Sequence, residues 1–221
     1  SRDIDPSSIQ AIFVTHEHSD HISGIRVFQK RYGCQIFATE GTLKGMEKSV
    51  PINDSFCCIN SHPILPYGDL EIEWFHTPHD TNESCDYIIR TPDDRKIAVC
   101  TDLGHITGEI KQKLRTCDFV LLESNHDIKM LKAGPYPPPL QERILGPKGH
   151  LSNDTCATLL PELVQSGVTQ IKLGHISKHN NSFSLAEKTA VDALINAGCI
   201  LNEDYRLSLA KPISNDPITY L

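Results

Sequence analysis

The stretch from residue 13 to 24, F-V-T-H-E-H-S-D-H-I-S-G, constrains the fold of this chain more than any other. Three imidazoles and a carboxylate in it, His16, His18, Asp20 and His21, fall within six positions and can all bind a metal. The apolar run Ile12 to Val14 precedes them and predicts a buried strand. We therefore expect the cluster at a strand's carboxyl end, where open α/β sheets place their ligands. His16 and His18 can reach one ion, whereas Asp20 and His21, on the following turn, can face a second.

Three more polar side chains follow predicted strands: His79 after 70–77, Asp102 after 96–101, and His175 after 170–173. Alone, His79 and Asp102 each have an ordinary structural explanation. A histidine after a proline is commonly a turn residue, and His76, inside the strand before His79, is a rival candidate. An aspartate that ends a strand is commonly a helix N-cap, here of a helix predicted over 106–114, although both roles can coexist.

The remaining periodicity predicts interleaved helices and strands. Besides 106–114, we expect helices over 25–32 (ended by Gly33), 41–49, 155–165 (capped by Ser152 and Asn153) and 184–196. We expect further strands over 35–39, 56–59, 64–66, 86–90, 117–123 and 205–210. We expect residues 86–101 to form a hairpin. Residues 128–149 are rich in Pro and Gly, and we expect them to form an ordered surface loop. This order indicates a layered α/β fold in one domain over 1–221.

Composition narrows the class of protein. No apolar run approaches the ~20 residues that a membrane helix needs, so we expect a soluble protein that contacts no membrane. The opening residues do not resemble a signal peptide, and the eight cysteines lie mostly beside apolar residues as reduced thiols, which favours the cytoplasm. A net charge of −7 argues against nonspecific coating of nucleic acid. It does not exclude a nuclease, because bound divalent cations supply local positive charge.

The string H-x-H-x-D-H at 16–21 resembles the signature of the metallo-β-lactamase fold, a superfamily of mostly dinuclear metal hydrolases. The resemblance implies an αββα sandwich, in which two facing sheets are flanked by helices. In that family the first strands usually precede the string, whereas residues 1–10 here resemble a helix end and a linker. We therefore expect a domain that is incomplete at its N-terminus.

The resemblance also implies a ligand set for two divalent ions, Zn²⁺ or Mn²⁺. In the family pattern, one ion is bound by His16, His18 and His79, and the other by Asp20, His21 and His175. Asp102 bridges the two ions. Asp20 is also expected among the catalytic residues. Paired ions of this kind lower the pKa of water and stabilise both oxygens of an in-line displacement at phosphorus.

The second half of the chain resembles a narrower group. Glu123 in L-L-E-S-N, His150 in G-H-L-S-N and His175 in G-H-I-S-K-H follow the order of the transfer-RNA 3′-processing branch and its relatives. There a glutamate orients a histidine that protonates the leaving oxygen, so Glu123 and His150 are expected to be catalytic. A helix-capping residue or a satisfied buried carboxylate is the structural alternative for each. The similarity is closest to the YycJ/WalJ branch, whose members are exonuclease-like.

The predicted function is therefore a dinuclear phosphodiester hydrolase, a 5′-to-3′ DNA exonuclease if the resemblance transfers. Its substrate contacts are expected at His126, Lys148 and Lys178, with Lys132 and Arg143 as further candidates for phosphate. Two alternatives remain open. One is a small-molecule hydrolase of the same fold, cleaving a cyclic phosphodiester, a thioester or a lactam. The other is a non-catalytic regulatory module that keeps metal for stability.

Overall fold

The computed structural model describes residues 4–211 and divides into two compact units. The first unit runs to Leu65 and takes in Asp80–Cys85, and the second comprises Pro66–His79 and the chain from Asp86 onward. The single domain predicted over 1–221 stays a prediction. The tail prolines at 212 and 217 lie outside the described residues.

The first unit contains a parallel sheet in the order β1-β2-β3. Its elements are a 3₁₀ turn η1 (Pro6–Ser8), strands β1 (Ala11–Phe13), β2 (Gln35–Ala38) and β3 (Phe56–Cys58), and helices α1 (Ser19–Ile22), α2 (Ile25–Tyr32) and α3 (Glu40–Met46). Ile25 of α2 and Met46 of α3 are buried in one core with Ile36 of β2. Gly33 ends α2 at a φ of 71°, a backbone conformation that glycine adopts without strain, as the sequence predicted.

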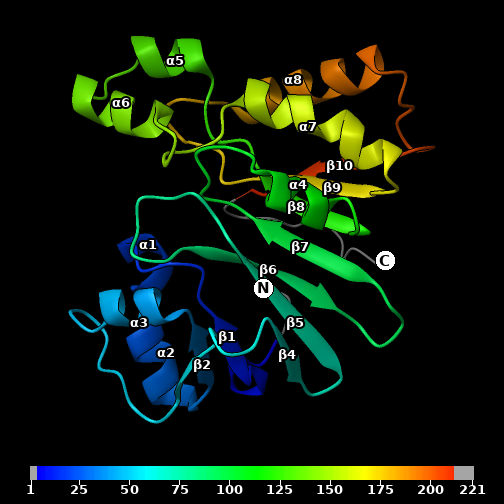
Figure 1. Cartoon of the computed structure of the whole chain (residues 1–221). Helices are drawn as coiled ribbons and strands as arrows, with labels where there is room; N and C mark the ends of the chain where they lie inside the picture. Colours follow the sequence, from blue (N-terminus) through cyan, green and yellow to red (C-terminus); the bar gives the residue numbers. More distant parts are fainter. Residues whose placement is uncertain (1–3, 212–221) are drawn as a thin grey trace. The chain divides into compact units, whose positions relative to one another are not determined.

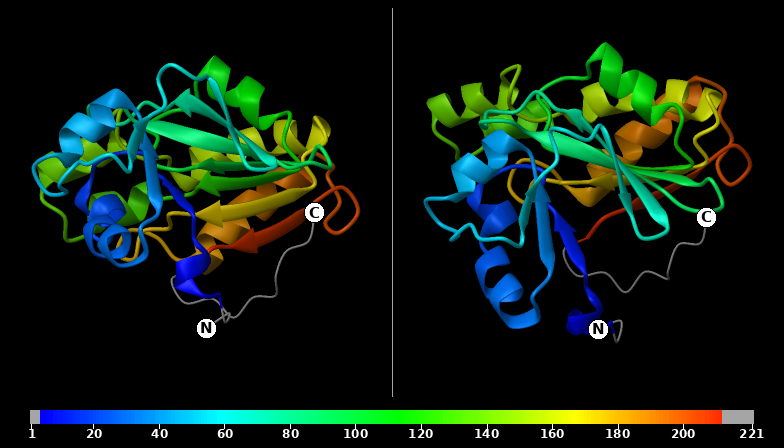
Figure 2. Two further views of the ribbon diagram at one scale, coloured as in Figure 1. Left: turned by 90° about the horizontal axis from the view of Figure 1, so that it is seen from below. Right: turned by 60° about the horizontal axis from the view of Figure 1, so that its bottom comes forward.

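The second sheet has seven strands in the order β10-β9-β8-β7-β6-β5-β4. Their bounds are β4 (Ile64–Tyr67), β5 (Leu70–His76), β6 (Cys85–Arg90), β7 (Lys96–Cys100), β8 (Phe119–Glu123), β9 (Gln170–Gly174) and β10 (Arg206–Leu209). Strands β7 to β10 are mutually parallel and lie side by side in Figure 2. Strand β6 is antiparallel to β7, which confirms the predicted hairpin. The parallel strands bring their carboxyl ends to one edge of the sheet.

Three helices complete the core of the second unit, and Figure 1 shows α7 and α8 next to each other. They are α4 (Gly108–Leu114), α7 (Asn153–Gln165) and α8 (Phe183–Asn196). Ser152 caps α7 as predicted, because its Oγ accepts the Thr155 N–H at 3.1 Å. Helix α4 is capped by Thr107 and not by Asp102, so the N-cap role considered for Asp102 is wrong. Asp102 is therefore available for another role.

The segment predicted as a loop over 128–149 contains two short helices, and this expectation is wrong. They are α5 (Ile128–Ala133) and α6 (Pro138–Leu145). Asp127 caps α5, and prolines are tolerated in the first turn of α6 because no helical partner is needed there. Each helix buries one apolar side chain, Leu131 and Ile144 respectively. Among the described residues, no helix is long and apolar enough to cross a membrane.

Candidate metal centre

The first group of predicted ligands follows β1, as the sequence indicated. The Thr15 hydroxyl lies 3.0 Å from Nδ1 of His16 and 3.2 Å from Nδ1 of His21. A hydroxyl can donate to one of these nitrogens and accept from the other, so it fixes the orientation of both rings. The ring centroids of His16 and His21 are 3.9 Å apart. With Nδ1 engaged in each ring, Nε2 is the nitrogen that suits a metal.

His18 and Asp20 belong to the same turn. Nε2 of His18 is 3.6 Å from Oδ1 of Asp80, and the ring of His18 meets that of His16 edge-on at 4.7 Å between centroids. Asp20 lies in the first turn of α1, with Oδ2 4.0 Å from Nε2 of His21 and a side chain that is 71% exposed. The four predicted ligands of this stretch are therefore neighbours within the first unit.

The second group assembles at the carboxyl ends of the parallel strands in the second unit. Asp102 follows β7, Glu123 ends β8, and His175 follows β9, where Glu123 pairs with Gly174. Asp102, Glu123, His150 and His175 each offer one ligand atom within 4.8 Å of the others. Two predicted ligands, Asp102 and His175, and two of the three predicted catalytic residues, Glu123 and His150, thus form one cluster.

Glu123 is the centre of this cluster. Its Oε1 accepts from Nδ1 of His150 at 2.9 Å and from Nδ1 of His175 at 2.6 Å. Its Oε2 accepts the backbone N–H groups of Leu103 at 3.0 Å and Leu151 at 3.1 Å. The carboxylate therefore orients both rings and the residues that follow Asp102 and His150. The expected contact between Glu123 and His150 is present, and the one with His175 was not anticipated.

Glu123 is ionised although its side chain is fully buried. Burial is the largest single influence on this carboxyl and opposes its ionisation. The hydrogen bonds from His150 and His175, together with the charges of these imidazoles, outweigh burial and lower the pKa of Glu123 to about 2. An ionised carboxylate holds the proton of each ring on Nδ1, which leaves Nε2 of each for other chemistry.

His79, and not its rival His76, lies beside Asp102. Nδ1 of His79 donates to the carbonyl of Gly149 at 3.1 Å, and its Nε2 is 3.9 Å from Oδ1 of Asp102. His76 is exposed and packs against the Trp74 ring. Position 149 requires glycine, because a Cβ there would lie 2.1 Å from the Ile144 carbonyl oxygen. The glycine before His150 thus lets the chain approach closely enough to orient His79.

The predicted substrate contacts have two different environments. His126 is 1% exposed, and its ring nitrogens have no hydrogen-bond partner among the described residues. Burial lowers the pKa of His126, which favours a neutral ring. Lys132, Arg143, Lys148 and Lys178 are all exposed. Lys148 stands two positions before His150, and Lys178 three after His175, which puts positive charge in the chain next to the cluster.

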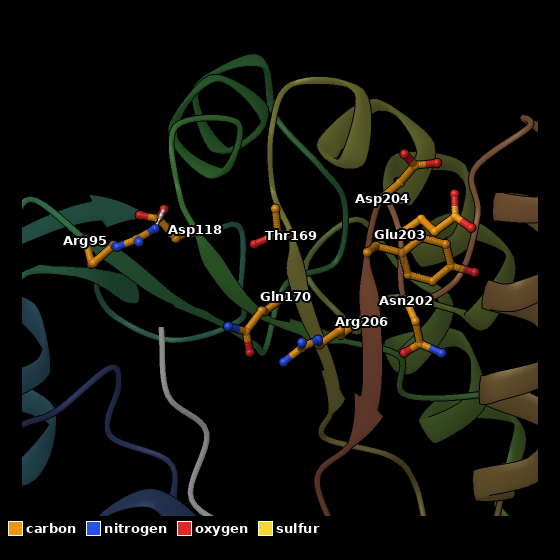
Figure 3. Close-up of a pocket in the computed structure, with 9 residues that line it drawn as sticks. Arg95, Asp118, Thr169, Gln170, Asn202, Glu203, Asp204 and Arg206 are labelled. Atoms are coloured by element: carbon orange, nitrogen blue, oxygen red, sulfur yellow. Dashed lines mark hydrogen bonds and ion pairs between the residues drawn. The ribbon is translucent and has the colours of Figure 1, made fainter.

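A separate pocket of about 370 Å³ lies at the opposite ends of the same strands. Its lining comes from residues at or before the starts of β7 to β10, including Arg95, Asp118, Gln170 and Arg206 (Figure 3). Arg95 donates to Asp118 at 2.9 Å. None of the predicted ligands contributes to this pocket.

Sequence reasoning missed three residues that touch the candidate ligands or their neighbours. Thr15 directly precedes His16, and Asp80 directly follows His79, so proximity to a ligand was the available signal. Asp86, buried on β6, accepts the Thr101 N–H at 3.0 Å. Burial, followed by the nearby charge of Asp102, raises the pKa of Asp86 well above its usual range. Its only sequence signal was an acidic residue within an apolar strand.

The profile of the Beta-lactamase superfamily domain matches residues 2–169, and the chain belongs to this family. The chain is 33% identical over 218 residues to exodeoxyribonuclease WalJ of Streptococcus pneumoniae, covering 97% of this chain and 81% of the relative. It is 31% identical to exodeoxyribonuclease YycJ of Bacillus anthracis, covering 97% and 82%.

A comparison of structures agrees with this family. The metallo-β-lactamase fold protein YhfI from Bacillus subtilis superposes with a TM-score of 0.68 at 14% identity, covering 95% of this chain and 78% of YhfI. The layered α/β fold of the metallo-β-lactamase class and the predicted resemblance are thereby confirmed. The fold implies binding of divalent metal.

Proposed function

We propose that this protein is a metal-dependent exodeoxyribonuclease that degrades DNA from 5′ to 3′ with two divalent ions, Zn²⁺ or Mn²⁺. The relatives named exodeoxyribonuclease, similar over nearly the whole chain, support the reaction class. The observation that carries the proposal is the pair formed by Glu123 and His150 at the candidate metal centre. Phosphodiester cleavage expels an alkoxide that needs a proton, and this pair is suited to deliver one.

The donor chemistry fits divalent ions of the zinc type. Imidazole nitrogens and carboxylate oxygens predominate, and outer partners orient the rings, as the Gly149 carbonyl does for His79. The proposed ligands are the side chains predicted from the sequence: His16, His18, Asp20, His21, His79, Asp102 and His175. When bound, such ions activate water and stabilise charge on phosphoryl oxygens. Metal analysis of the loaded protein should find two ions per chain.

His150 is the proposed general acid. Glu123 stays ionised and accepts from Nδ1 of His150, so it stabilises the protonated ring and presents Nε2–H toward the substrate. Transfer of the Nε2 proton to the leaving oxygen neutralises the alkoxide as the P–O bond breaks. The neutral ring that remains keeps its Nδ1–H on Glu123 and regains a proton from water.

Lys148 and Lys178 are the proposed contacts to DNA phosphates, together with Lys132 and Arg143 around them. Lys132, Lys148 and Lys178 are exposed, so their charge is available to a phosphate. His126, neutral and without a polar partner among the described residues, is the proposed contact to an uncharged part of the nucleotide. The free thiols of all eight cysteines support a reducing compartment, the cytoplasm.

The test measures cleavage of end-labelled DNA and of bis-p-nitrophenyl phosphate by the full chain at several salt concentrations. Release of label from the 5′ end first is expected for a 5′-to-3′ exonuclease. DNA cleavage should fall with salt on a log-log plot, since each phosphate contact releases counterions. Charge reversal at Lys148 and Lys178 should weaken DNA cleavage and flatten the slope while the small substrate is hydrolysed normally.

Lys188, an exposed lysine of α8 paired with Asp192, provides the matched control. Its charge reversal should leave both reactions and the salt slope unchanged. Equal loss on DNA and on the small substrate, or no DNA cleavage by metal-loaded wild type, would refute the nuclease. If the protein then hydrolyses only small esters, the result favours the small-molecule hydrolase. If it hydrolyses neither substrate, the result favours the regulatory module.

A further inference from the structure

Asp86 is a buried acid that the proposed mechanism does not use. It lies on β6 with 0% of its surface exposed. Its Oδ2 accepts the backbone N–H of Thr101 at 3.0 Å, whereas its Oδ1 has no hydrogen-bond partner among the described residues. A carboxyl group is costly to bury, and the carboxylates of Asp102 and Glu123 nearby add to that cost. Its contacts therefore indicate what it contributes.

The hydrogen bond from Thr101 acts directly before the proposed bridging ligand. Asp102 has a φ of 59°, a left-handed backbone conformation that is strained for a residue other than glycine and persists only where the surrounding structure enforces it. Directly after Asp102, the Leu103 N–H donates to Oε2 of Glu123 at 3.0 Å. The two N–H groups that flank Asp102 are thus both held by buried carboxyl groups on neighbouring strands.

We propose that Asp86 is a positioning residue for the metal centre, which holds the backbone before Asp102 as Glu123 holds the backbone after it. The inference rests on the proposed function, because it takes Asp102 as a ligand. Asp86 itself touches neither metal nor substrate. Its hydrogen bond and that of Glu123 enforce the left-handed turn from which the Asp102 carboxylate projects.

Strand β7, which leads to Asp102, offers a matched control at its start. Asp118 accepts the N–H of Lys96, the first residue of β7, through Oδ2 at 2.9 Å, and Arg95 through Oδ1 at 2.9 Å. Figure 3 shows Asp118 and Arg95 at the far pocket. Asp118 therefore holds the start of β7 as Asp86 holds the residue after its end. Only Thr101, the residue held by Asp86, is next to a proposed ligand.

The experiment compares full-length wild type with Asp86→Asn, Asp86→Leu and Asp118→Ala. Asparagine keeps an oxygen that can accept the Thr101 N–H, whereas leucine has a similar size and no acceptor. Zn²⁺ affinity is measured by competition with a chromophoric chelator, below the unfolding temperature of every variant, and kcat and KM are measured on bis-p-nitrophenyl phosphate.

Asp86→Leu should bind Zn²⁺ about 10–100-fold more weakly, the usual effect of losing an outer partner of a ligand, and should lose kcat rather than raise KM. Asp86→Asn should restore most of the affinity. Asp118→Ala should lower the unfolding temperature and leave Zn²⁺ affinity unchanged.

Three results would overturn the inference. The first is wild-type affinity in a folded Asp86→Leu protein, and the second is equal weakening in Asp86→Asn and Asp86→Leu. The third is an equal loss of Zn²⁺ affinity in Asp118→Ala, which would show that any disturbance of β7 weakens metal binding. A wild type that binds no Zn²⁺ would refute the proposed function as well, so the two failures are distinguishable.

Discussion

Replacing Glu123 by glutamine tests the central claim about the candidate metal centre, because one carboxylate there accepts four hydrogen bonds. The amide of Glu123→Gln has one oxygen and one NH₂ group. The N–H groups of Leu103 and Leu151 cannot change character, so the oxygen must face them. The NH₂ group then faces Nδ1 of His150 and of His175, which can accept only if their protons move to Nε2.

The cost to stability follows from this exchange. Hydrogen bonds to a charged group contribute about 1.5–3 kcal/mol each and neutral ones about 0.5–1.5, so four bonds lose about 4 kcal/mol in total. Glutamine carries no charge, so the variant avoids the cost of burying a carboxylate, and this offsets part of the loss. We expect the free energy of unfolding to fall by about 2–4 kcal/mol, measured by urea titration of the metal-free protein.

The loss of function should exceed the loss of stability. A proton on Nε2 of His175 removes the lone pair proposed to bind metal, so metal affinity should fall about 10–100-fold. His150 loses the carboxylate that stabilises its protonated form, so phosphodiester turnover should fall by about 10²–10⁴. Metal affinity is measured by chelator competition, and turnover on bis-p-nitrophenyl phosphate.

Acid unfolding provides an independent readout of the same substitution. The pKa of Glu123 is lowered from 4.5 to about 2, so its ionisation stabilises the folded state above the unfolded pKa. That contribution, about 3 kcal/mol, is lost as the pH falls from about 4.5 toward 2. Unfolding of Glu123→Gln should therefore depend less on pH in this window than unfolding of the wild type.

Glu162 provides the control for the glutamine substitution. It is a partly exposed glutamate of α7 that pairs with Lys111 of α4 and with Arg115, the residue that follows α4. Glu162→Gln should change stability only slightly and leave metal affinity and turnover intact. A folded Glu123→Gln protein with the metal affinity and turnover of the wild type would refute the proposed role of Glu123.

Three further predictions follow from the site. His150→Ala should lower phosphodiester turnover by about 10²–10⁴ with metal content unchanged, whereas loss of metal would make His150 a ligand. Metal analysis should show that His79→Ala loses an ion and His76→Ala does not; the reverse pattern would exchange their roles. Alkylation of the native protein should modify exposed Cys58 and spare Cys117, where burial raises the pKa to about 11; mass spectrometry showing early modification of Cys117 would contradict this packing.

The sequence by itself determined the elements whose signals are local. The apolar run from Ile12 to Val14 placed β1 before the histidine cluster, and Gly33 and Ser152 marked a helix end and a helix start. Each of these signals depends on residues within a few positions, such as a left-handed glycine or a hydroxyl that caps an N–H. The order of polar residues after strands likewise indicated Asp102 and His175 before any fold was known.

Only the tertiary structure decided how distant residues share partners. Glu123 meets His175 because β8 pairs with β9 in the register that sets Glu123 beside Gly174, and it meets His150 where the chain before α7 returns to the end of β8. Nothing near Asp86 in the chain indicates that it holds the N–H of Thr101, a contact that depends on the pairing of β6 with β7. Such contacts join residues that are far apart in sequence, so strand register and burial create them and no local pattern encodes them.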